Sequence, residues 1–438
     1  MSTETHQPSP DTPETPETTE NGDAAVAQAA ATAAPEVIAN SLGEYARIQL
    51  RRIRSGESGA LPVVIGLVAI VIYFQARNSL FLSPGNLVNL LIQGAPYIIL
   101  GMAEVFVLLL GEIDLAVGFT GAVAAVITAW TVFSVPWWIA IILGLGTGAA
   151  LGLLFGLLIT RLGLPSFVVT LAGLLGLQGL MIVLVARSGH GPGGSIPINN
   201  KIIGDLTEGN LSPAAGWIVM VVIVVLAAAV LLMRDRQRRA AGLVTPPISV
   251  TGLKIGVMAV AGVVVVLIGN ADRGTALQAL RGVPWVTLIV LGVLGIWTFL
   301  LGRTRFGRYI YAIGGNAEAA RRAGVSLNRI RTLAFVLTGL TGAIAGIILA
   351  SRLGSISTDV DGGQLVLFAV AAAVIGGTHL FGGHGKMLNA LIGGLVVAAI
   401  ANGLALLGTS AAATYIVTSL VLLAAVSVDA LSRRGKTS

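Results

Sequence analysis

Cysteine is missing from the chain, and charged residues are scarce. The absence of cysteine excludes disulfides, thiolate metal sites and cysteine nucleophiles. With only four histidines, a metal site built from several histidines is not expected. Asp, Glu, Lys and Arg make up 11% of the 438 residues, less than half of the ~25% that is usual in soluble domains. Because so few charges cannot cover a water-soluble globule, a soluble protein is excluded.

Apolar residues take the place of the missing charges. The residues A, V, I, L, M, F, W, Y and C make up 55% of the chain, and the mean hydropathy is +0.89. A helix of ~20 apolar residues crosses a ~30 Å hydrocarbon layer. We therefore predict an all-α, polytopic transmembrane bundle of about twelve spans, and the 57 glycines favour helices that are partly broken. The predicted spans are 61–76, 86–110, 115–133, 136–160, 165–186, 213–233, 253–270, 284–301, 332–350, 365–381, 387–407 and 412–430.

Lysine and arginine are unevenly shared between the two sides of the predicted bundle. If the first span leaves the cytoplasm, the cytoplasmic ends collect 21 of the 27 basic residues and the external ends collect six. Cytoplasmic loops are normally the more basic ones. We therefore predict a protein of the plasma (cytoplasmic) membrane with both termini in the cytoplasm. The basic excess is interpreted as a topology signal, and nucleic acid is not expected as a partner.

The chain is expected to divide into two regions, one ending at residue 44 and the other beginning at residue 45. Residues 1–44 hold eight of the twenty acidic residues, no Lys or Arg, and almost no large apolar side chain, so we predict a disordered acidic tail. Residues 45–438 form the predicted transmembrane domain. Its long loops are the external segment 187–212, rich in Gly, Pro and Asn, and the cytoplasmic segment 302–331, which carries seven arginines.

Glycine recurs at helical spacing in the fourth predicted span, at Gly144, Gly148, Gly152 and Gly156. Four glycines spaced by four residues make a smooth surface against which a neighbouring backbone packs closely. We predict a helix-packing surface, either inside one subunit or between two.

Two carboxylates stand between apolar runs, at Glu112 and Asp114, and Glu104 lies two turns earlier. An acid at the bilayer centre costs ~2.5–3.5 kcal/mol on insertion scales, so such groups usually line a cavity or find a partner. Two interpretations stay open. The acids line a polar pathway, or Glu112 and Asp114 lie at a cytoplasmic helix junction where Asp114 caps the next helix.

The cytoplasmic loop contains a short predicted helix. Asn316 is a good N-cap, residues 317–323 are mostly strong helix formers, and Gly324 is a residue at which a helix naturally ends. Glu318 and Arg322 are placed for an i,i+4 ion pair. The helix suits docking of a cytoplasmic partner, and an ordinary solvated loop helix is the alternative.

Three separated motifs resemble a known family. They are GEIDLAVG at 111–118, FGRYIYAIGGNAEAARRAGV at 306–325 with the glycine-rich helix that follows, and AAAVIGGTHLFGGHGKMLNALIGG at 371–394. Over roughly residues 61–431 the chain resembles the membrane permease subunit of ribose/xylose-type ATP-binding-cassette sugar importers. Glu112 resembles the xylose-type branch, whereas Ala116 replaces the serine that is usual in relatives.

The resemblance implies a homodimeric permease embedded in membrane lipid. A cytoplasmic ATPase subunit would bind ATP and Mg, and an external sugar-binding protein would deliver a pentose, xylose by resemblance. The chain itself is then neither an enzyme nor a cofactor-binding protein, and its terminal GKT lacks the first glycine of a P-loop. The segment that matches the family's coupling helix is Asn316, Ala317, Glu318, Ala319, Ala320, Arg321, Arg322, Ala323 and Gly324.

Uncharged sugar needs hydroxyl partners rather than a buried counter-ion. The predicted pathway or gate residues are Asn86, Asn89, Gln93, Glu104, Glu112, Asp114 and Gln178. A proton-coupled secondary transporter of a small solute, working through Glu104, Glu112 or Asp114, is the alternative function. No metal site and no catalytic residue is expected.

Overall fold

The computed structural model describes residues 43, 44, 47, 61–189, 194–243, 245, 247–274 and 279–434. The acidic tail predicted for residues 1–44 lies outside this part of the chain, apart from its last two residues. More than three quarters of the described residues are helical, and the prediction of an all-α membrane protein is confirmed.

Within the described residues, eight helices are long and apolar enough to cross a membrane. They are α4 (Pro84–Leu108), α6 (Trp137–Leu162), α7 (Ser166–Ser188), α9 (Pro213–Ala240), α10 (Ile248–Asn270), α11 (Trp285–Arg303), α14 (Leu327–Leu353) and α16 (Met387–Leu406). Shorter apolar stretches lie in α3 (Leu61–Arg77), α5 (Val117–Thr131), α15 (Gly362–Ile375) and α17 (Ala411–Arg434). Every predicted span therefore falls on a helix, while the number of actual crossings stays a prediction.

One boundary differs clearly from the sequence prediction. The span expected at 365–381 corresponds to α15, which ends at Ile375. Gly377 has a φ of 98°, a left-handed conformation that glycine adopts without strain and that stops a helix. The chain then forms an irregular loop, 376–386, before α16 begins at Met387.

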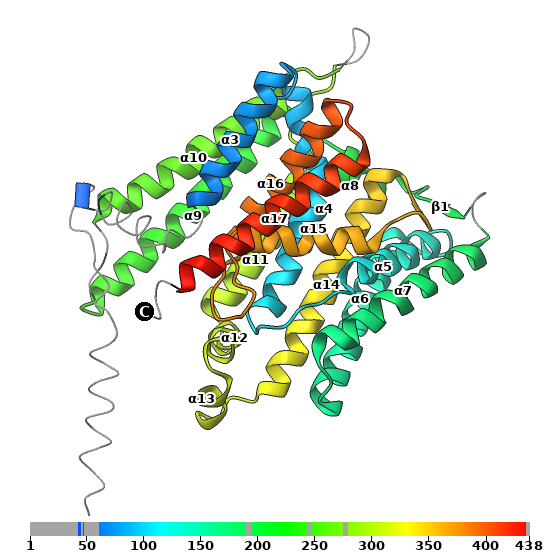
Figure 1. The fold of residues 1–438 in the computed structure, drawn as a ribbon. Coiled ribbons are helices and arrows are strands. Elements are labelled where there is room, and N and C mark those ends of the chain that lie inside the picture. Colours follow the sequence, from blue (N-terminus) through cyan, green and yellow to red (C-terminus); the bar gives the residue numbers. More distant parts are fainter. Residues whose placement is uncertain are drawn as a thin grey trace, which may run out of the picture.

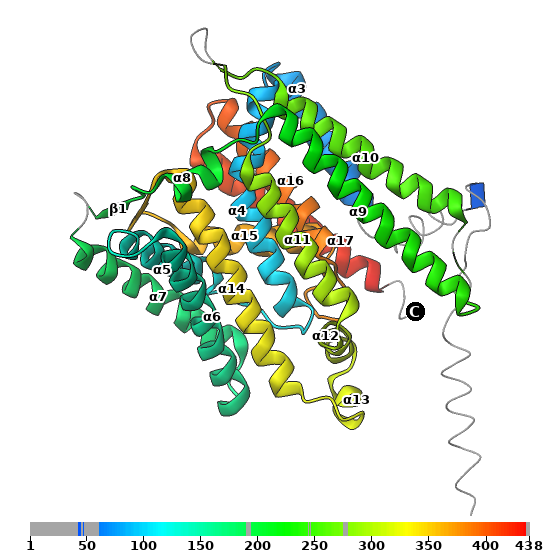
Figure 2. The ribbon, with the colours of Figure 1, turned by 180° about the vertical axis from the view of Figure 1, so that it is seen from behind.

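The remaining elements lie at the two ends of the molecule (Figures 1 and 2). The short helices α12 (Arg305–Gly315) and α13 (Ala317–Arg322) are at one end, which we call the α13 end. The strands β1 (Ser195–Pro197) and β2 (Ser355–Ser357) and the helix α8 (Lys201–Glu208) are at the opposite end, the β1 end. The strands pair antiparallel, with Ile196 opposite Ile356.

Helices α4, α14 and α16 form the buried centre, and glycine determines how closely α6 approaches it. The four glycines predicted to form a packing surface lie along α6 where it faces α14 and α5. A Cβ at Gly152 would collide with the carbonyl oxygen of Phe335, and one at Gly156 would come within 2.9 Å of the Cα of Thr332. This surface packs inside one subunit.

Helices α9 and α10 form a peripheral hairpin. The two helices pack on each other, and few side chains of either are buried. Near the α13 end, the hydroxyl of Thr251 donates to Oδ2 of Asp235 across the pair, at 2.6 Å. At the β1 end the backbone N–H of Leu211 donates to the carbonyl of Val283, at 2.9 Å, so the chain enters and leaves the hairpin at neighbouring points.

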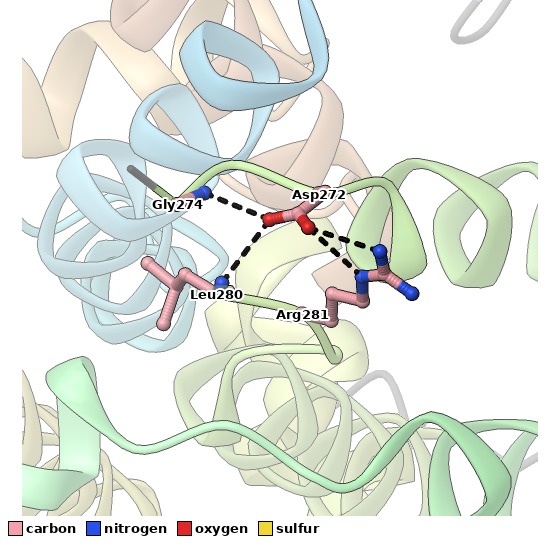
Figure 3. A network of polar contacts seen from close by, with 4 residues as sticks. All are labelled: Asp272, Gly274, Leu280 and Arg281. Carbon is pink, nitrogen blue, oxygen red and sulfur yellow. Dashed lines mark hydrogen bonds and ion pairs between the residues drawn. The ribbon is translucent and has the colours of Figure 1, made fainter. Parts of the chain in front are cut away.

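A hydrogen-bonded turn around Asp272 follows the hairpin at the β1 end (Figure 3). One carboxylate oxygen of Asp272 accepts from the N–H groups of Gly274 and Leu280, at 3.0 and 3.2 Å, and the other accepts from the guanidinium of Arg281. The Gly274 N–H, the Arg281 side chain and the Leu280 N–H lower the pKa of Asp272 below its ordinary value. The aspartate therefore stays charged and holds this turn.

Candidate functional site

Helices α12 and α13 begin at side-chain caps. The hydroxyl of Thr304 accepts from the N–H of Gly307 at the start of α12, at 3.2 Å. Asn316 ends α12 and starts α13, where its Oδ1 accepts from the N–H of Ala319 at 2.9 Å. Gly324, with a φ of 81°, follows the second helix. The local sequence thus specifies a helix–cap–helix unit that projects from the α13 end.

Glu318 gives the tip of this unit a fixed charge pattern. Its carboxylate pairs with Arg321 at 2.9 Å and with Arg322 at 3.1 Å. Hydrogen bonds from Arg321 and then Arg322 lower the pKa of Glu318. All three side chains are at least half exposed, so these pairs contribute little to stability. They give the tip of the unit an ordered, charged surface.

The base of the unit meets two breaks in the membrane helices. The first break, 109–116, joins α4 to α5, and the second is the 376–386 loop between α15 and α16. The N–H of Gly383 donates to the carbonyl of Leu109 at 2.9 Å. The hydroxyl of Tyr311 on α12 donates to the carbonyl of Gly385 at 2.7 Å. The three motifs found in the sequence therefore converge, and we call this contact the helix-break junction.

Glycine is required at the helix-break junction because backbones touch there. A Cβ at Gly314 of α12 would collide with the carbonyl oxygen of Leu109. Gly111 and Gly382 have φ values of 74° and 87°, and a Cβ at Gly382 would lie 3.0 Å from the nitrogen of Gly111. Neither conformation suits other residue types. Gly314 therefore brings the backbone of α12 directly against both breaks.

The three acids predicted near this point have different surroundings. Glu112 faces Arg331 at the start of α14, with 3.4 Å between Oε1 and Nε, and its side chain is only 14% exposed. Asp114 is buried, and its Oδ1 accepts from the N–H of Ala116 at 2.9 Å just before α5. The geometry agrees with the helix-junction interpretation for these two residues.

Glu104 is fully buried in α4. Neither of its carboxylate oxygens has a hydrogen-bond partner among the described residues. Asp114 is near enough to act on Glu104 electrostatically. Of the three acids, Glu104 is the one that lies within a membrane helix.

A cluster of side-chain amides lies between α4 and α16. Asn86 and Asn402 exchange two hydrogen bonds, at 2.8 and 3.1 Å, and Nδ2 of Asn402 also donates to Oε1 of Gln93 at 3.4 Å. Sequence reasoning missed Asn402, although an asparagine inside an apolar span was the signal. Asn89 and Gln178 do not join the cluster, because both side chains are exposed on the surfaces of α4 and α7.

The second break contains a pair of neighbouring histidines. His379 and His384 lie with their rings 5.1 Å apart. No group of three His, Cys, Asp or Glu residues that could hold a metal ion occurs among the described residues.

Comparisons with known proteins bear on this arrangement. The family model described as branched-chain amino acid transport system / permease component matches residues 86–238 and 239–426. The xylose transport system permease protein XylH of Escherichia coli (strain K12) is 35% identical over 377 residues, which is 85% of this chain and 92% of the relative. XylH of Haemophilus influenzae is 34% identical over 382 residues, covering 85% and 97%.

The ribose import permease protein RbsC of Escherichia coli (strain K12) is also similar, 31% identical over 377 residues that cover 85% of this chain and 93% of the relative. No solved structure gives a significant match. The resemblance drawn from the three sequence motifs is thereby confirmed. The chain belongs to the permease family of the branched-chain amino acid transport system / permease component type.

Proposed function

We propose that this chain is the transmembrane permease subunit of an ATP-driven sugar importer and forms the translocation pathway for a pentose, xylose. The substrate class follows from the relatives, which are named as xylose and ribose permeases and are matched along nearly their whole length. The observation that supports an importer coupled to ATP hydrolysis is the convergence of α12 on both helix breaks.

Two partners follow from this proposal. A cytoplasmic ATPase subunit, which binds ATP and Mg, docks on the α13 end, where Asn316 to Gly324 present the ordered ion pairs. An external sugar-binding protein docks on the β1 end. The functional unit is a homodimer of the permease in membrane lipid. The α13 end then faces the cytoplasm together with both termini, in agreement with the 21 basic residues assigned to that side.

The mechanism uses two arrangements of the helix bundle. Closure of the ATPase dimer displaces α13, and α12 carries the displacement to the carbonyl of Leu109 and the backbone of the second break. Both breaks end membrane helices, so α5 and α16 shift their direction relative to α4 and α15. Such packed contacts have discrete arrangements and convert a small shift into a switch between outward and inward openings.

The amide cluster supplies the polar groups that an uncharged sugar needs. Asn86, Gln93 and Asn402 offer donors and acceptors to each other when no solute is present, and they offer the same groups to sugar hydroxyls. Selection between sugars rests mainly on the binding protein.

Uptake by reconstituted vesicles tests this function. The permease, its ATPase and its sugar-binding protein are placed in proteoliposomes, and entry of labelled xylose is followed with and without internal ATP. We expect uptake that requires ATP hydrolysis and survives an uncoupler. Uptake abolished by the uncoupler while ATP is held constant would favour the proton-coupled transporter, in which Glu104 carries the proton.

A further inference from the structure

A basic cavity lies at the α13-end terminus of the peripheral hairpin. Its volume is about 490 Å³. Helix α9 and the turn after it form one wall, and the last residues of α11 form the other. The lining residues are Arg234, Gln237, Arg238, Leu243, Gly302 and Arg303.

The three arginines of this cavity lack counter-charges in the described part of the chain. Their side chains form no ion pair and no hydrogen bond with another described residue. The acid nearest in sequence, Asp235, does not line the cavity and accepts the hydroxyl hydrogen of Thr251 instead. Three guanidinium groups around one space repel each other unless an anion lies between them.

Guanidinium chemistry narrows the class of anion. Arginine presents a planar fork of donors that matches the oxygens of a phosphate group in a bidentate manner. The amide of Gln237 adds a neutral donor at the same wall. A phosphate group therefore accepts more of the hydrogen bonds that these side chains can donate than a single carboxylate does.

The surface above the cavity indicates where the rest of the ligand lies. Helix α9 exposes Val225, Leu226, Val230 and Met233 in the turns that precede Arg234. Its packing partner is α10, so this face of α9 borders lipid. Basic residues at the cytoplasmic end of a membrane helix attract anionic lipid headgroups. The exposed apolar surface and the basic cavity therefore follow each other along the same helix, α9.

We propose that this cavity binds the phosphate headgroup of an anionic phospholipid, whose acyl chains lie along the exposed face of α9. Arg234 and Arg238 hold the phosphate from the hairpin, and Arg303 holds it from the end of α11. The lipid then bridges the hairpin to the helix that leads into α12. This binding site goes beyond the proposed sugar import, and its test needs no transport.

The test measures lipid binding to the purified full-length chain in detergent. Phosphatidylglycerol and phosphatidylcholine with identical acyl chains are titrated, and bound lipid is counted by native mass spectrometry. The cavity variant combines Arg234→Gln, Arg238→Gln and Arg303→Gln. The control combines Arg236→Gln, Arg308→Gln and Arg329→Gln, which remove the same charge outside the cavity lining.

We expect the cavity variant to bind phosphatidylglycerol at least about tenfold more weakly, since each arginine near an anionic headgroup contributes roughly a fivefold gain in affinity. The control should lose much less affinity, because its three arginines do not line the cavity. Equal loss in both variants, or no loss in either, overturns the proposal. If the triple variant unfolds, Arg303→Gln alone should weaken binding by roughly fivefold, and unchanged binding again contradicts it.

Two further measurements show whether something other than a phospholipid occupies the cavity. An excess of inorganic phosphate should leave phosphatidylglycerol bound, because the acyl chains add apolar contacts on α9. Displacement of the lipid by phosphate overturns a lipid site in favour of a soluble phosphate. Loss of ATPase co-purification in the cavity variant, with lipid binding intact, likewise overturns it in favour of a protein contact.

Discussion

Helices α4 and α9 show that hydropathy and burial are separate properties in this molecule. The most apolar window of α9 has a mean hydropathy of 3.0 and only 6% of it is buried, whereas the window of α4 reaches 1.7 and is 78% buried. In water the more apolar helix would be the buried one. Inside a bilayer, the lipid tails are as apolar as a leucine side chain, so apolar side chains alone do not bring helices together.

Small residues and polar groups explain the difference between these two regions. A Cβ at Gly94 or Gly101 of α4 would come within 2.7 or 2.8 Å of an alanine Cβ on α16 or α15. The side-chain amides of Asn86 and Gln93 add hydrogen bonds to Asn402 on α16. The membrane part of α9 offers mainly large aliphatic side chains to its surroundings. The centre is therefore held by close backbone approach and amide hydrogen bonds, whereas the hairpin packs mainly on itself.

The largest effect is expected where a side chain is forced between two central helices. Gly152→Leu places a side chain against the backbone of Phe335 on α14, and overpacking of this kind costs about 3 kcal/mol. Thermal unfolding in detergent should show a strong loss of stability. Gly146→Leu is the matched control, because nothing lies within 4 Å of a Cβ there on the same helix. Equal loss in both variants would contradict the packing explanation, because leucine is the better helix former at both positions.

At the helix-break junction we expect a smaller effect on stability but a large effect on the coupling of ATP hydrolysis to sugar uptake. Gly314→Ala puts a Cβ against the carbonyl of Leu109 and separates α12 from the first break, at a cost of about 1–2 kcal/mol. ATP hydrolysis should continue while sugar uptake falls. The neighbouring Gly315→Ala meets nothing within 4 Å and should leave uptake intact. Normal uptake by the Gly314 variant contradicts transmission through this contact.

Removal of the peripheral hairpin should change the stability of the centre little. Residues 212–282 are replaced by a short Gly-Ser linker, because Leu211 and Val283 are already hydrogen-bonded neighbours. The unfolding free energy of the remaining bundle should stay within about 1 kcal/mol of the parent, since few interhelical contacts are lost. A bundle that no longer folds would show that the hairpin belongs to the core.

The smallest effect is expected at the exposed turn of Asp272, and it depends on pH. The pKa of Asp272 is lowered in the folded state, so its contribution to stability is fully present above its ordinary value of 3.8 and is lost as the pH falls through the folded pKa. Asp272→Asn should speed hydrogen exchange in this turn at neutral pH. The difference from the parent should vanish at low pH, and a difference that grows on acidification would contradict the assignment.

Local sequence patterns were sufficient for the helices and for contacts within one helix. The twelve apolar segments all lie on helices, and the pair between Glu318 and Arg322 forms at 3.1 Å because four residues make just over one turn. Gly377 ended α15 earlier than hydropathy indicated, since an apolar run does not reveal a left-handed residue.

Contacts between distant segments were beyond reach of those patterns. The hydrogen bond between Gly383 and Leu109 and the pairing of Glu112 with Arg331 join residues more than 200 positions apart. Polarity alone also does not tell which face of a helix is buried. Asn402 therefore joined the amide cluster without having been predicted, and Gln178 faces outward from α7.

In the proposed importer, α13 receives the movement of a cytoplasmic ATPase, and an exchange of the charges on α13 shows whether it does. Glu318→Arg combined with Arg322→Glu keeps an i,i+4 pair on the helix but reverses the surface it presents. We expect normal expression and thermal stability, with loss of ATPase co-purification and of ATP-driven xylose uptake in proteoliposomes. Unchanged co-purification together with unchanged uptake would contradict the account.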